Sequence, residues 1–172
     1  MSSTDDERVT TLLGRRPMGA YEVVVRRADG DPVVLRNEPL LPDGTPMPTR
    51  YWLCDPDLRS AIGTIESDGG IDAVEAALGL GVIAVTHDAY AAERDAALPD
   101  DLQGPRPSGG VGGTRVGVKC LHAHYAHWLA GGDDPVGEWT HKQLVARSMV
   151  PVGAPGRIAS GRWRPSTAAP TP

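Results

Sequence analysis

Residues 21–36 read YEVVVRRADGDPVVLR, and this stretch decides the fold that we expect for the chain. Apolar, mostly β-branched side chains occupy both ends, and Asp29-Gly30 lies between them. An Asp-Gly pair between two such runs is a strong signal for a tight turn joining antiparallel strands. The stretch therefore predicts a β-hairpin, with strands over residues 21–27 and 32–36. Residues 50–54, which read RYWLC, predict a short third strand that ends before Asp55-Pro56.

Helices are expected around and after these strands. Asp55 can cap a helix that begins at Pro56, because proline suits the first helical position. In that helix Leu58, Ile62 and Ile65 fall on one face. Further helices are predicted over residues 3–13, 71–80, 83–98, 116–130 and 136–148, although 82–85 is also compatible with a strand. This order indicates an α+β fold, a small antiparallel sheet (the hairpin plus the third strand) packed against four to five helices.

The chain of 172 residues is long enough for one domain. We expect a single globular domain over residues 1–150. From residue 151 onward Pro, Gly, Ala, Arg and Ser dominate, and such a composition buries too little apolar surface to fold. Residues 151–172 are therefore predicted to form a disordered tail.

Charge and hydropathy exclude several classes of protein. The net charge of -5 and the isoelectric point near 5.5 disfavour a nucleic-acid partner. No apolar run approaches the roughly 20 residues that a membrane helix needs, and the first residues lack the pattern of a signal peptide. Two cysteines without an export signal are expected to be free thiols or ligands rather than a disulfide. We expect a cytoplasmic protein without membrane insertion, and the sequence identifies no protein partner.

Residues 119–130, which read KCLHAHYAHWLA, hold three of the five histidines and one of the two cysteines. On a helix, Cys120, His124 and His127 fall within about 60° of one another. A thiol and imidazoles are ligands that zinc prefers, but one helix supplies only two or three of about four. A remote ligand is needed, for which Cys54 in the third strand is the first candidate. The alternative candidates for the remote ligand are Asp55 and His87.

Other roles stay open for this segment. His122 points away from the predicted metal face, so that His122 and Lys119 are candidates for a catalytic role toward a substrate. Cys120 is alternatively a small buried apolar residue, with the histidines as partly exposed helix residues. In a third interpretation Cys120 is a nucleophile activated by a neighbouring histidine or by Lys119.

Two further motifs concern anions. Arg15 and Arg16 lie in a turn that reads GRRPMG, and arginine pairs bind phosphates and carboxylates well. We therefore expect them to bind a small anionic substrate. The glycine-rich loop 108–113 is interpreted as a hinge or, alternatively, as a contact for a phosphate. It does not match the phosphate-loop pattern, because Val118 stands where that pattern requires lysine.

The chain resembles a bacterial family catalogued as domain of unknown function 501, which is common in actinobacteria. The resemblance rests on residues 14–19 (GRRPMG), 48–53 (PTRYWL), 118–124 (VKCLHAH) and 134–137 (DPVG), and it covers about residues 10–140. It implies that Lys119, Cys120, His122 and His124 belong to the signature of the family, but it implies no activity. Members often read Leu-Thr-Cys-Pro in the third strand, so Cys54 stands one position earlier here and faces the opposite side of the strand.

Two functions remain as hypotheses, and the sequence leaves open whether the protein is an enzyme. The first is a small metal-binding, hydrolase-like enzyme that uses zinc at the Cys/His cluster. The second is a non-catalytic interaction protein associated with cell division or envelope growth. The second follows from the resemblance, since genes of the family often lie near a gene for a septum-formation initiator.

Overall fold

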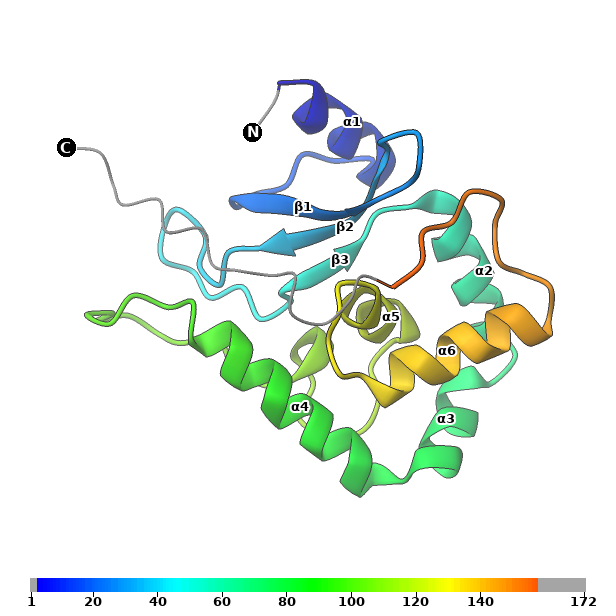
Figure 1. Cartoon of the computed structure of the whole chain (residues 1–172). Helices are drawn as coiled ribbons and strands as arrows, with labels where there is room; N and C mark the ends of the chain where they lie inside the picture. The colour runs from blue at the N-terminus through cyan, green and yellow to red at the C-terminus, as the bar shows by residue number, and fades with distance from the viewer. Residues whose placement is uncertain (1–2, 158–172) are drawn as a thin grey trace.

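The structure, a computed structural model, describes residues 3–157. It confirms the predicted α+β fold with a three-stranded antiparallel sheet in the order β1-β2-β3 (Figure 1). The strands are β1 (Tyr21–Arg26), β2 (Pro32–Asn37) and β3 (Tyr51–Leu53). The six α-helices found within residues 3–157 are α1 (Ser3–Leu13), α2 (Pro56–Ser67), α3 (Gly70–Leu78), α4 (Leu80–Asp95), α5 (Leu121–Leu129) and α6 (Pro135–Ala146).

The hairpin forms as predicted. Val34 of β2 pairs with Val25 of β1 on one side and with Leu53 of β3 on the other. In the turn, the backbone N–H of Gly30 donates to the carbonyl of Arg27 over 3.0 Å. Gly30 has a φ of +95°, a conformation that glycine adopts without the strain that a side chain would bring.

Side chains alternate between the two faces of the sheet, and each face is covered by helices. On one face, Leu35 and Cys54 pack with Val9 of α1. On the other face, Val34 and Leu53 pack against the remaining helices. α1 and α5 accordingly lie on opposite sides of the sheet (Figure 1).

The second core layer is built around α5. Helix α2 begins as predicted, because the side chain of Asp55 accepts the backbone N–H of Leu58 over 2.9 Å and Pro56 takes the first helical position. Ile62 and Ile65 are fully buried. Helices α2, α4 and α6 surround α5 (Figure 1), whose Leu121 and Leu129 are fully buried as well.

Residues 82–85 belong to a helix, since α4 runs without a break from Leu80 to Asp95. Gly79, with a φ of +78°, separates α3 from α4. None of the helices in residues 3–157 can cross a bilayer alone by length and composition. The two helices α3 and α4 reach the required length only together, and they are bent by 97° at their junction.

The described part of the predicted tail, residues 151–157, returns to the domain. The guanidinium of Arg157 donates to three backbone carbonyls at the end of α5. That of Trp128 lies in the last turn of the helix, and those of Gly131 and Gly132 lie just after it. Arg27 donates to the carbonyl of Val152 over 2.8 Å. The rest of the predicted tail, 158–172, lies outside the described residues.

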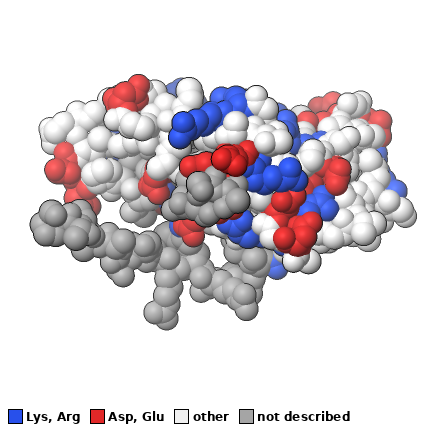
Figure 2. Space-filling model, turned by 90° about the horizontal axis from the view of Figure 1, so that it is seen from above, with Lys and Arg blue, Asp and Glu red and all other residues white. Residues whose placement is uncertain are grey.

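Acidic and basic side chains are intermixed on the face shown in Figure 2. Ion pairs join α1 to the hairpin, namely Arg8 with Asp31 and Arg26 with Asp5. These exposed pairs contribute little stability each, because water screens them.

Candidate functional site

Helix α5 begins later than its sequence suggests, and this changes where Cys120 lies. A helix was predicted over residues 116–130, but the structure begins it at Leu121, with Cys120 as an extended N-cap residue at φ −158°. Gly117 has a left-handed φ of +67°, and the backbone N–H of Val118 donates to Glu75 over 2.7 Å. These contacts keep residues 117–120 out of the helix. The predicted common face of Cys120, His124 and His127 therefore does not form.

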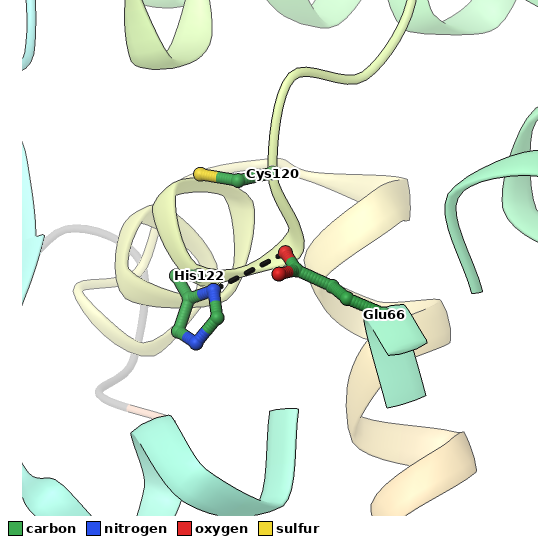
Figure 3. A group of neighbouring side chains, drawn as sticks. All are labelled: Glu66, Cys120 and His122. Atoms are coloured by element: carbon green, nitrogen blue, oxygen red, sulfur yellow. Dashed lines mark hydrogen bonds and ion pairs between the residues drawn. The ribbon is translucent and has the colours of Figure 1, made fainter. Parts of the chain in front are cut away.

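Cys120 instead lies beside His122 and Glu66 (Figure 3). Glu66 comes from the last turn of α2, and it accepts the backbone N–H of Leu121 over 2.5 Å. Its Oε1 lies 3.1 Å from Nδ1 of His122. One ligand atom of each of the three side chains lies within 4.8 Å of those of the other two. Elsewhere in the described part of the chain, no three His, Cys, Asp or Glu side chains converge this closely.

The His122 ring is held at both nitrogens. Nδ1 faces Glu66, and Nε2 lies 3.0 Å from the carbonyl oxygen of Arg59. Burial, the largest single influence, lowers the pKa of His122, but the Cys120 side chain, the Arg59 carbonyl and the Glu66 charge together raise it above its ordinary value. A carbonyl that accepts Nε2–H leaves Nδ1 as the atom that can bind a metal.

A cleft of about 300 Å³ opens beside Cys120 and His122. Its wall combines segments that are far apart in the sequence, since Leu13 precedes the hairpin, Tyr51 and Trp52 belong to β3, and Gly112 follows α4. Three basic side chains, Arg15, Arg59 and Lys119, complete the wall.

The cleft thus brings together only some of the residues that were predicted to bind an anion or to act in catalysis. Arg15, Lys119 and His122 line the same cleft, whereas the cleft wall does not include Arg16. Arg59 is a basic wall residue that the sequence analysis did not single out.

His124 and His127 form a separate, buried cluster with Asp134. The Nδ1 atoms of His124 and His127 lie 2.9 and 3.0 Å from Oδ2 of Asp134. Asp134 also accepts the backbone N–H of Gly137 and so caps α6. Nε2 of His124 is buried without a hydrogen-bond partner among the described residues. This cluster joins α5 to α6, and Cys120 is not part of it.

None of the three predicted remote ligands meets Cys120. Cys54 is fully buried under α1, and burial raises the pKa of its thiol to about 12, with the Asp55 charge acting in the same direction. Asp55 caps α2 and binds Arg27. His87 accepts the N–H of Val111 at Nδ1, and its Nε2 lies 2.9 Å from the carbonyl of Gly117.

The glycine-rich loop is packed closely against its surroundings. A side chain at Gly110 would overlap the ring of His87, and Val111 is buried. Gly112 lies in the short 3₁₀ turn Val111–Gly113, where its carbonyl accepts the ammonium of Lys119 over 3.2 Å. The loop therefore forms one side of the cleft and orients Lys119.

Glu66 was missed, although the sequence carried a signal for it. Four residues along a helix amount to about 400°, so Glu66 lies only about 40° from Ile62 on the apolar face of α2. A carboxylate so close to a buried face needs polar partners. Leu121 and His122 supply them.

The fold and the cleft define an α+β protein with a Cys/His/Glu group, of which the cysteine and the histidine line a basic pocket. A family model described as "Protein of unknown function (DUF501)" matches residues 23–142, and the chain belongs to this family. No curated protein and no solved structure matches the chain.

Proposed function

We propose that this protein is a small zinc-dependent, hydrolase-like enzyme whose metal ligands are Glu66, Cys120 and His122. The observation that carries the proposal is the convergence of their ligand atoms within 4.8 Å, beside a cleft that Cys120 and His122 line. In a tetrahedral zinc site such atoms lie about 3.5 Å apart, so a small contraction brings them to ligand distance.

The donor set is the reason for choosing zinc. A thiolate and an imidazole suit zinc and disfavour magnesium and calcium, which prefer oxygen ligands. The contacts around these three ligands also fit a metal site. The backbone carbonyl of Arg59 accepts Nε2–H of His122, and the backbone N–H of Leu121 donates to Glu66. Such contacts fix the orientation of metal ligands.

Three protein ligands are the number found in catalytic zinc sites, where a fourth position remains for water or substrate. Zinc in such a site makes a bound water nucleophilic near neutral pH. The protein would contribute the cleft beside the ligands, and Lys119 is held at its wall by the Gly112 carbonyl. In this assignment His122 is a ligand, and Lys119 serves the substrate.

Metal content of the purified full-length protein tests the proposal. The wild type is expected to hold one zinc per chain, whereas Glu66→Gln and Cys120→Ala lose it. Glu66→Gln keeps an oxygen that can accept the Leu121 N–H, so its fold is preserved. Cys54→Ala is the matched control, because it removes the other cysteine, which lies in the core under α1, and should leave the zinc content unchanged. A wild type without zinc even after the metal is added, or equal zinc in all variants, would refute the assignment.

A second candidate function is a non-catalytic role in protein interaction. It is favoured by the apolar side chains of Leu80, Val82 and Val85 on α4, which are 52, 45 and 69% exposed. This role predicts that Val85→Ser abolishes binding of a protein partner and leaves the zinc content unchanged.

A further inference from the structure

The three basic residues of the cleft wall are held in place by neutral groups. The guanidinium of Arg15 lies 5.1 Å from the centre of the Trp52 ring. Lys119 donates to the carbonyl of Gly112, and Arg59 to the carbonyl of Leu12 over 3.4 Å. Within residues 3–157 none of the three pairs with a carboxylate. All three residues are exposed, and each keeps a neutral contact while no carboxylate among the described residues pairs with its charge.

Several basic residues elsewhere in the fold do pair with carboxylates. Arg27 binds both Asp55 and Asp57, and Arg147 pairs with Asp68. Glu66 is the acid nearest to the thiol and the imidazole of the cleft, but the Leu121 N–H and His122 already occupy it. The cleft therefore keeps an excess of positive charge.

Zinc at the proposed ligands would not remove this excess. The thiolate of Cys120 and the carboxylate of Glu66 would balance the two charges of the ion, and the three basic side chains would still face the cleft.

We infer that the cleft binds a small molecule through an oxyanion group, a phosphate or a carboxylate, held by Arg15, Arg59 and Lys119. Guanidinium and ammonium groups donate charge-assisted hydrogen bonds to such anions. Molecules that carry such a group would be the substrate class of the proposed enzyme, and this assignment rests on the proposed function. Of the predicted pair, Arg15 lines the cleft together with Arg59 and Lys119, whereas Arg16 does not line it.

Calorimetric titration of the full-length, chelator-treated protein tests this site. Inorganic phosphate and malonate are the two probes, and the one that binds more tightly identifies the anionic group. Substituting Arg15, Arg59 or Lys119 by Gln should weaken binding about tenfold each, which corresponds to one charge-assisted hydrogen bond. Arg16→Gln is the matched control, because it removes the neighbouring charge outside the cleft wall, and it should leave affinity unchanged.

A second measurement locates the anion independently of these variants. Cys120 lines the cleft and Cys54 is fully buried, so alkylation of the native protein reports on Cys120. Saturating phosphate or malonate should slow this alkylation severalfold. Absence of binding by both probes, an equal effect of Arg16→Gln, or alkylation that ignores the bound anion each overturns the inference. Zinc content of the same protein preparations, measured before chelator treatment, separates the two proposals. Anion binding by a protein that is purified without zinc retains the anion site and removes only the zinc-dependent enzyme.

Discussion

The carboxylate of Asp134 lies 3.0 Å from Nδ1 of His127, and the contact is completely enclosed between α5 and α6. The same carboxylate binds His124 and the backbone N–H of Gly137. One acidic side chain thus caps α6 and binds the Nδ1 atoms of two buried imidazoles. The cluster that was predicted to bind metal is better explained as the connection between two helices.

We expect Asp134→Asn to lower the free energy of unfolding by about 3 kcal/mol, because it removes the charged partner of two buried histidines. Asparagine can still cap the helix, so the loss reports mainly on the charge. Chemical denaturation measures the effect. Asp133→Asn changes an exposed neighbour and should leave stability within about 0.5 kcal/mol of the wild type. Equal stability of both variants would contradict this view of Asp134.

Stability should also depend on Asp134 in acid. Burial, the largest single influence, raises the pKa of Asp134, but hydrogen bonds from His124 and His127 and their charges lower it to about 2. A folded-state pKa below the ordinary 3.8 means that the charged form stabilises the fold above pH 4, and that this contribution is lost as the pH falls toward 2. Unfolding midpoints of the wild type and Asp134→Asn between pH 5 and 2 should therefore converge. If the difference between the two unfolding midpoints stayed constant over this range, a group other than Asp134 would be responsible for the loss of stability in acid.

Two helical glycines provide a matched test of packing. A side chain at Gly137 of α6 would lie 2.5 Å from the carbonyl oxygen of His124 and would overlap Trp128, whereas Gly63 of α2 has nothing within 4 Å. Gly137→Ala should destabilise the protein by about 1–3 kcal/mol, the usual cost of overpacking. Gly63→Ala should stabilise it by about 0.5–1 kcal/mol, since alanine is the better helix former. Thermal unfolding of both variants measures the difference, and a shift in the same direction would contradict the close approach of α5 and α6.

The elements that depend on local sequence were predictable. The turn at Asp29-Gly30 and the cap at Asp55-Pro56 need only their own residues, and both form as expected. The register of β1 with β2 was less predictable, because it shifts between Val23 and Val25 and again between Val25 and Arg26.

The site depended on contacts that local sequence does not encode. Helical periodicity placed Cys120 and His124 on one face, but Glu75 and Glu66, from two other helices, take up the N–H groups of Val118 and Leu121. These long-range hydrogen bonds delay the start of α5 and separate Cys120 from the buried histidines. Three residues that the sequence singled out nevertheless line the same cleft, namely Lys119, Cys120 and His122.

Glu66 has two partners at once, the first backbone N–H of α5 and the ring of His122. Any ligand that draws its carboxylate away from Leu121 alters the hydrogen bonding at the start of that helix, and the central helix of the core begins there. Occupancy of the proposed metal site and the solvent protection of the Leu121 amide would then be thermodynamically linked. The first turn of α5 would act as a built-in reporter of whether the site is filled.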